Sequence, residues 1–216
     1  MKQNYTHISV VLDRSGSMAS VVDDTIGGFN SFLEEQKKVE GLGTLTLVQF
    51  DNVYEVVNNF IDLKQIRPLT RETFQPRGST ALLDAIGRTI NETGRRLGEL
   101  AERERPDKVV FVILTDGEEN SSREFNNQQI NDSITHQRDV YKWEFVFLGA
   151  NQDAISTASQ MGISTQNAMT YAANSAGTQA AFSAVSRNLA GYRMNAAPSS
   201  AFAAEDYEAQ KKAGVK

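Results

Sequence analysis

Two strongly apolar segments of the sequence each end at an aspartate, and this arrangement constrains the fold more than any other feature. Residues 7–12 read HISVVL and precede Asp13, whereas residues 109–114 read VVFVIL and are followed, after one threonine, by Asp116. Runs so apolar and so rich in β-branched residues predict strands that are buried on both faces, as in a parallel sheet. Parallel strands present their carboxyl ends at one edge of a sheet, so we expect the two aspartates to emerge there together.

Amphipathic helices are predicted between the strands. Val22, Ile26, Phe29 and Leu33 recur at helical spacing, and a similar apolar stripe runs from residue 82 to residue 100. The remaining pattern predicts helices over 125–138, 153–161 and 175–192, and strands over 44–50, 54–60, 144–149 and 168–172. Turn-forming residues at 51–52 predict that the strands over 44–50 and 54–60 form a hairpin at the edge of the sheet.

This alternation of strands and helices predicts an α/β fold. We expect a doubly wound, Rossmann-like three-layer sandwich whose central sheet has about six strands, mostly parallel, with one antiparallel edge strand. The chain of 216 residues suits one domain, which we place at residues 1–194. Residues 195–216 are Ala-rich and polar with little apolar periodicity, so we expect a disordered or loosely docked tail.

Composition argues against several kinds of partner and location. A net charge of −5 disfavours the broad basic surface that nucleic-acid binding needs. The longest apolar runs are far shorter than the roughly 20 residues of a membrane-spanning helix. The chain has no cysteine, and its first residues enter a strand without the apolar stretch of a secretory signal. We therefore expect a cytoplasmic protein, monomeric by itself, that binds neither nucleic acid nor membranes.

Oxygen-bearing side chains gather where the predicted strands end. Asp13, Ser15 and Ser17 follow the first strand at alternate positions, Thr80 stands at the start of a helix after Gly78, and Asp116 follows the most apolar strand. Hydroxyls with few carboxylates favour a hard cation over zinc or copper, so Mg²⁺ is the first choice, with Mn²⁺ or Ca²⁺ as alternatives. The same residue types also cap helices and form turns, which is the structural alternative for all five.

These three segments, Asp13-x-Ser15-x-Ser17, Gly78-Ser79-Thr80 and Thr115-Asp116-Gly117, resemble the metal-ion-dependent adhesion site of von Willebrand factor A domains. The resemblance covers roughly residues 6–193 in architecture, whereas only the three short segments are specific. It implies that Ser15, Ser17 and Thr80 contact the metal, and that Asp13 and Asp116 bind it directly or through water. It also implies a sixth position for a partner's Glu or Asp. By analogy alone, such partners include AAA+ ATPases and stress-response complexes.

Several neighbouring polar residues have two interpretations. Arg14 either orients an incoming carboxylate or is solvated, and Asp84 either supports the site from the next helix or is a solvated acid. Glu118 and Glu119 either extend the site or are simply exposed. His7 and His136 lie at no recognisable catalytic or metal-ligand spacing, so we expect both to be structural or surface residues.

Three functions agree with these features. The first is a protein-binding module, or adaptor, that captures a partner carboxylate through its cation. The second is a metal-dependent hydrolase or phosphoryl-transfer enzyme, although the sequence has no phosphate-binding loop, no nucleophile elbow and no histidine placed as a base. The third is a virion or assembly component that uses the domain for interaction. We favour the first and expect no enzymatic activity.

Overall fold

The structure is a computed structural model that describes residues 1–150 and 153–215. Its strands are β1 (Lys2–Asp13), β2 (Leu42–Phe50), β3 (Tyr54–Asp62), β4 (Pro106–Thr115), β5 (Glu144–Ala150) and β6 (Ala168–Tyr171). They form one six-stranded sheet in the order β3-β2-β1-β4-β5-β6. All neighbouring pairs in this sheet are parallel except β2 and β3, which are antiparallel. The predicted mostly parallel sheet with one antiparallel edge strand is therefore confirmed.

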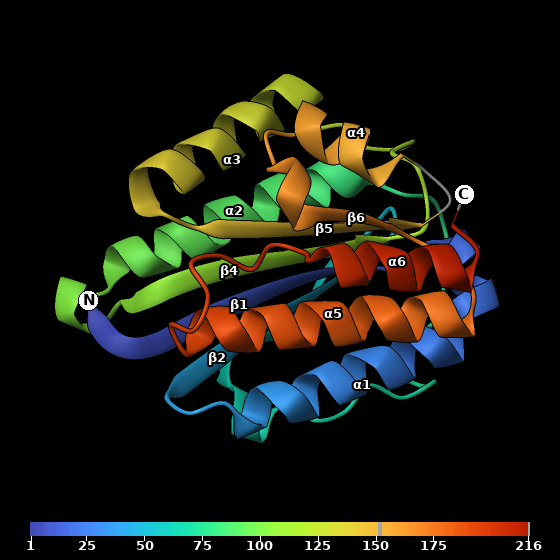
Figure 1. Cartoon of the computed structure of the whole chain (residues 1–216). Coiled ribbons are helices and arrows are strands. Elements are labelled where there is room, and N and C mark those ends of the chain that lie inside the picture. Colours follow the sequence, from blue (N-terminus) through green and yellow to red (C-terminus); the bar gives the residue numbers. More distant parts are fainter. Residues whose placement is uncertain (151–152, 216) are drawn as a thin grey trace.

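Helices cover both faces of the sheet (Figure 1). One face carries α1 (Val22–Lys38), α5 (Ser175–Arg193) and α6 (Ala204–Ala213), and the other carries α2 (Leu82–Glu99), α3 (Asn127–Tyr141) and α4 (Ala154–Gln160). The three-layer sandwich follows from connectivity, because each parallel crossover places a helix on one face of the sheet. No helix in the described part of the chain has both the length and the apolar character needed to cross a bilayer.

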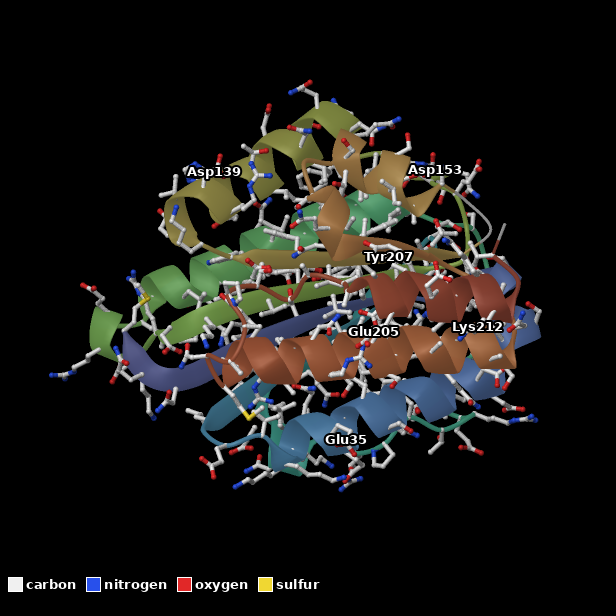
Figure 2. The ribbon with its side chains drawn as sticks, viewed as in Figure 1. Glu35, Asp139, Asp153, Glu205, Tyr207 and Lys212 are labelled. Carbon is white, nitrogen blue, oxygen red and sulfur yellow. The ribbon has the colours of Figure 1, made fainter. Side chains whose placement is uncertain are left out.

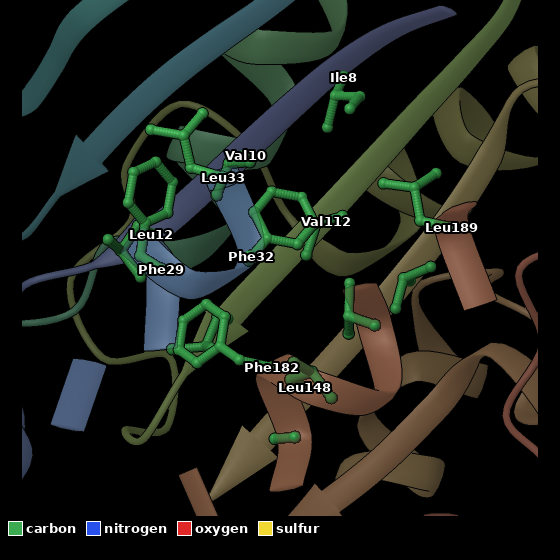
Figure 3. Close-up of a cluster of buried hydrophobic side chains, with 14 of the residues drawn as sticks. Ile8, Val10, Leu12, Phe29, Phe32, Leu33, Val112, Leu148, Phe182 and Leu189 are labelled. Atoms are coloured by element: carbon green, nitrogen blue, oxygen red, sulfur yellow. The ribbon is translucent and has the colours of Figure 1, made fainter. Parts of the chain in front are cut away.

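The central strands bury both of their faces. In β1, Ile8, Val10 and Leu12 belong to the core beneath α1 and α5, whereas Val11 belongs to the core beneath α2 and α3. Figure 3 shows the first of these cores, where Phe32 of α1 and other aromatic and aliphatic side chains meet the sheet. Alternate residues of one strand thus anchor helices on opposite sides, which explains the continuous apolar runs in the sequence.

A polar cluster is enclosed within the amino-terminal half of β1. His7 is fully buried, its Nδ1 lies 2.9 Å from Thr44 Oγ1 and its Nε2 lies 3.2 Å from Ser9 Oγ. Burial lowers the pKa of His7 to about 3, with a further contribution from the charge of Arg96. The imidazole is therefore neutral and structural, whereas His136 is exposed on α3.

The carboxyl-terminal segment differs from the sequence prediction. Residues 204–213 form α6, which packs against α5 and β6. Tyr207, labelled in Figure 2, donates a hydrogen bond from its hydroxyl to the carbonyl of Ala168 in β6 at 3.0 Å. Phe202, Asp206 and Gln210 are buried. The prediction of a disordered or loosely docked tail over 195–216 is wrong for this helix. The segment has only a weak apolar stripe, and polar contacts hold it against the rest of the domain instead.

Candidate metal centre

The loops that carry the predicted ligands meet at the carboxyl ends of β1 and β4. These two strands are parallel neighbours, with Leu12 opposite Leu114, so Asp13 and Thr115 leave the sheet beside each other. A 3-10 helix over Gly16–Val21 follows the first loop and leads into α1. Thr80 lies just before α2, on the loop that connects β3 to that helix. The topology thus brings together three segments that are far apart in the sequence.

Short hydrogen bonds join the first and third loops. Thr115 Oγ1 donates to Asp13 Oδ2 at 2.5 Å, and Ser17 Oγ donates to Asp116 Oδ1 at 2.5 Å. Within the first loop, the backbone N–H of Ser15 donates to Asp13 Oδ1 at 2.6 Å, and the hydroxyl oxygens of Ser15 and Ser17 are 3.0 Å apart. Asp13, Ser15, Ser17 and Asp116 therefore form one continuous polar cluster.

Thr80 joins this cluster beside Gly117. A Cβ atom added to Gly117 would lie 2.9 Å from Thr80 Oγ1, 3.3 Å from Ser17 Oγ and 3.6 Å from Ser15 Oγ. Three hydroxyl oxygens from two loops thus surround one small space that the glycine leaves open. All five residues singled out from the sequence converge here, although their role as metal ligands stays a prediction.

The two carboxylates of the cluster are held in a poorly solvated place. Burial raises the pKa of Asp13 to about 6, although hydrogen bonds from Thr115 and Ser15 oppose the shift. Burial also raises the pKa of Asp116, against the hydrogen bond from Ser17. No cationic side chain is among the causes of either shift. A bound cation would favour the ionised form of both groups, which makes the pair suited to one.

The donor set fits a hard divalent cation. It combines hydroxyl and carboxylate oxygens, the ligands that Mg²⁺, Mn²⁺ and Ca²⁺ prefer. Within residues 1–150 and 153–215, no group of three or more His, Cys, Asp or Glu side chains is placed to hold a metal. The candidate site differs from such groups because it combines two carboxylates with three hydroxyls.

Tyr171, at the end of β6, is a buried polar residue near the cluster that the sequence did not single out. It is 1% exposed, and its hydroxyl has no hydrogen-bond partner among the described residues. Its pKa is raised mainly by burial and then by the charges of Asp116 and Asp13. The residue reads as a core aromatic in the sequence, and only the sheet order brings it near the two carboxylates.

Arg14 does not adopt either orientation considered from the sequence. It is 5% exposed, so it is neither solvated nor presented to an incoming carboxylate. Its Nε donates to Asp51 Oδ2 at 3.1 Å, and its Nη1 donates to Glu55 Oε2 at 2.7 Å. The side chain thus points from the first loop towards the β2–β3 hairpin.

Asp84 and Glu119 fasten the third loop to the start of α2. The Asp84 carboxylate accepts hydrogen bonds from the backbone N–H groups of Arg123, Glu124 and Phe125 at 2.8–2.9 Å. Glu119 accepts one from the N–H of Leu83 at 2.9 Å, so it supplies an acceptor for an otherwise unpaired donor of the first helical turn. Asp84 therefore holds residues 123–125 of the loop against α2, while a role for it in supporting the metal site stays a prediction. Glu118 is exposed.

Asn120 completes this connection and was not identified from the sequence. Its Oδ1 accepts from the N–H of Thr80 at 2.9 Å, and its own N–H donates to the Thr80 carbonyl at 3.0 Å. This reciprocal pair holds the Thr80 loop against the loop that follows Asp116. An asparagine in a polar loop carries no signal for such a distant partner.

Comparisons with known proteins support the fold. Neither a protein-family model nor a curated protein matches the sequence. Solved structures do match, and they include the von Willebrand factor domain of the type V pilus tip protein Mfa5 from Porphyromonas gingivalis. That match has a TM-score of 0.60 and 12% identity, and it covers 85% of this chain and 94% of the other. The chain therefore has the von Willebrand factor A fold.

Two other similar structures were solved with a metal. Proximal thread matrix protein 1 from the mussel byssus, with a zinc-occupied MIDAS motif, matches with a TM-score of 0.58 and 16% identity over 90% of this chain. The chain spans 47% of the length of that protein. Manganese-loaded TRAP protein from Plasmodium vivax matches with a TM-score of 0.51 and 15% identity over 69% of this chain and 58% of the other.

Proposed function

We propose that this protein is a divalent-cation-dependent protein-binding module that captures a carboxylate of its partner. The observation that carries the proposal is the convergence of the Ser15, Ser17 and Thr80 hydroxyls around the space left by Gly117, beside two buried carboxylates. A structural role in capping and turn formation would not require three hydroxyls from two separate loops to share one space.

The roles of the residues follow from their chemistry. Ser15, Ser17 and Thr80 would contact the cation, while Asp13 and Asp116 would bind it directly or through water. The cation, when bound, supplies an electrophilic position for a Glu or Asp of the partner. Ser17 would hold its position through Asp116, and Asp13 through Thr115, because these pairs already meet at hydrogen-bonding distance.

Magnesium is the proposed cation. The oxygen-only donor set favours hard ions, and Mn²⁺ and Ca²⁺ are the alternatives. The zinc-occupied MIDAS motif of the byssus protein and the manganese-loaded TRAP protein support a divalent ion here. Competition between Mg²⁺ and Mn²⁺ for the purified protein would rank the ions.

The partner is proposed as a protein that supplies a Glu or Asp to the metal. An AAA+ ATPase or a stress-response complex is the proposed source, with this chain acting as a monomeric, non-enzymatic adaptor in the cytoplasm. Fractionation of source cells tests the location, and sedimentation of the purified protein tests the monomer. Neither nucleic acid nor a membrane has a part in the proposal.

The adaptor role is tested by affinity capture from source cells in Mg²⁺, in EDTA and with the Asp116→Ala variant. We expect partners that are retained in Mg²⁺ and lost in both other conditions, while the variant keeps its fold by circular dichroism. Partners that ignore both the metal and the substitution contradict the proposal. Metal-dependent turnover of a phosphate or ester substrate by pure protein, lost in the same variant, would establish the enzymatic alternative.

A further inference from the structure

A third buried carboxylate, Asp51, lies beside the two of the candidate metal centre. Asp51, in the turn between β2 and β3, has a fully buried side chain. Its Oδ2 accepts hydrogen bonds from Arg14 Nε at 3.1 Å and Arg77 Nε at 2.9 Å, and its Oδ1 accepts one from the backbone N–H of Val53 at 2.6 Å. Both carboxylate oxygens therefore accept hydrogen bonds, and these bonds fix the position of the Asp51 side chain.

The two arginines belong to two different loops of the metal centre. Arg14 stands between Asp13 and Ser15, whereas Arg77 precedes Thr80 by three positions in the loop that leads to α2. Asp51 therefore joins the loop of the paired serines to the loop of the threonine, although it belongs to neither.

Backbone hydrogen bonds run along the same seam. The N–H of Arg77 donates to the carbonyl of Arg14 at 2.8 Å, and the N–H of Gly16 donates to the carbonyl of Gly78 at 3.2 Å. Gly78 has φ of +69°, a left-handed conformation that favours glycine, and a Cβ there would also displace the Asn52 side chain, whose Oδ1 would lie 2.1 Å away. The seam thus fixes the spacing between the two loops.

Asp51 lies in a network of ion pairs whose charges balance. Arg14 is nearly buried, and it meets the acids Asp51 and Glu55, while Arg77 is more than half exposed and meets Asp51. Two cations and two acids thus form one neutral network. The Glu55 end of this network lies on β3, outside every loop that carries a predicted ligand.

We propose that Asp51 and Arg77 are positioning residues that set the distance between the Ser15–Ser17 pair and Thr80 for binding one cation. This inference rests on the proposed metal centre. Groups behind the direct ligands control metal affinity by orienting those ligands. Asn120 holds the other side of Thr80, so loss of the Arg77 side chain would leave only the backbone hydrogen bonds of the seam to hold this loop against the first loop.

The test compares Arg77→Gln with Glu55→Gln. Both changes remove one partly exposed ion pair from the same network, because the side chains are 58% and 52% exposed, but only Arg77 belongs to a ligand loop. The dissociation constant for Mn²⁺ alone is measured by electron paramagnetic resonance, together with the Tm of the metal-free protein. Arg77→Lys serves as the conservative variant that retains a donor for Asp51.

We expect Arg77→Gln to weaken Mn²⁺ binding by about 10-fold and to change the spectrum of the bound ion, while the metal-free Tm moves by no more than about 2 °C. Arg77→Lys should restore most of the affinity, and Glu55→Gln should leave affinity within about twofold of the wild type. Asp51→Asn should lower both affinity and metal-free Tm, because it removes the buried counter-charge of Arg14.

The outcomes separate this inference from the proposed function. If wild-type protein binds no Mn²⁺, the metal centre itself is refuted, and the positioning role with it. If wild-type protein binds Mn²⁺ and Arg77→Gln binds it equally well, only the positioning role is refuted. Equal weakening by Glu55→Gln and Arg77→Gln also refutes it, because the effect would then belong to the network as a whole.

Discussion

Replacing Gly117 by alanine should abolish metal binding while leaving the fold intact. The added methyl group would lie 2.9 Å from Thr80 Oγ1, 3.3 Å from Ser17 Oγ and 3.6 Å from Ser15 Oγ, in the space that the three hydroxyls share. The Thr80 and Ser17 oxygen atoms must shift slightly to relieve these contacts, so we expect a loss of stability of about 1–2 kcal/mol. Metal affinity should fall at least about 100-fold, or about 2.7 kcal/mol, because ligands are displaced rather than merely reoriented.

Thermal unfolding with and without Mg²⁺ measures this effect. Free metal at about 100 times its dissociation constant stabilises a folded protein by about 2.7 kcal/mol, which is about 5–11 °C in Tm for a chain of this size. Wild-type protein should show this increase, and Gly117→Ala should show no more than about 1–2 °C, because its weakened dissociation constant is then no smaller than the metal concentration. An increase of equal size in the variant would refute the view that the three hydroxyls bind the cation in this space.

Gly98→Ala is the matched control. Gly98 lies inside α2, and a Cβ added there meets no atom within 4 Å. Gly98 is in the last turn of α2, where alanine is at least as favourable as glycine, so this variant should melt no lower than the wild type. Its Mg²⁺-dependent increase should be unchanged, which separates a general effect of the substitution from a local one.

Three further predictions concern the site and its surroundings. Because burial raises the pKa of Asp13 to about 6, protons compete with the metal below that pH. Calorimetry should find that metal affinity falls as pH decreases from 7 to 5, and an affinity that does not change with pH contradicts this. The metal-free protein should gain stability over the same decrease, because folded Asp13 binds its proton more tightly than Asp13 of the unfolded chain does. Asp84→Ala removes the acceptor of three backbone N–H groups and should cost about 2 kcal/mol in urea unfolding, so an unchanged midpoint would refute its role in holding the third loop. Phe202→Ala should cost about 3 kcal/mol because this side chain is 8% exposed in the core, and an unaltered urea midpoint would mean that the carboxyl-terminal segment is loosely docked after all.

The sheet and the convergence of the five predicted residues followed from local patterns. Strands buried on both faces are apolar throughout, and their carboxyl ends must share an edge when they are parallel, so the sequence predicts that Asp13 and Asp116 lie together. The spacing of Ser15 and Ser17 after the strand and the glycine before Thr80 indicated oxygen-rich loops. Each of these patterns spans only a few residues, which is why the sequence alone predicts them.

Contacts over long separations in the sequence were not predictable in this way. Asp51 looked like an ordinary turn former, but its partners Arg14 and Arg77 lie 37 and 26 positions away. The sequence left two interpretations of Arg14 open, a contact with an incoming carboxylate or a solvated side chain, and neither includes a buried ion pair with Asp51. Only the pairing of β2 with β1 brings the hairpin turn beside the first loop and buries both charges.

The carboxyl-terminal helix was not predicted from the sequence for a different reason. Its docking depends on buried polar groups, such as Gln210, which accepts a hydrogen bond from the N–H of Ala172 and donates one to the carbonyl of Gly177. Asp206 likewise forms an ion pair with Arg187 and accepts from the N–H of Ala203. A search for apolar periodicity does not detect a helix held in this manner.

Anomalous diffraction from crystals soaked with Mn²⁺ tests the metal centre most directly. We predict one anomalous peak within bonding distance of the hydroxyl oxygens of Ser15, Ser17 and Thr80, beside Asp13 and Asp116, and its loss in crystals of Asp116→Ala. A soaked crystal with no peak at these hydroxyls, or with a peak that the substitution leaves in place, would contradict the account.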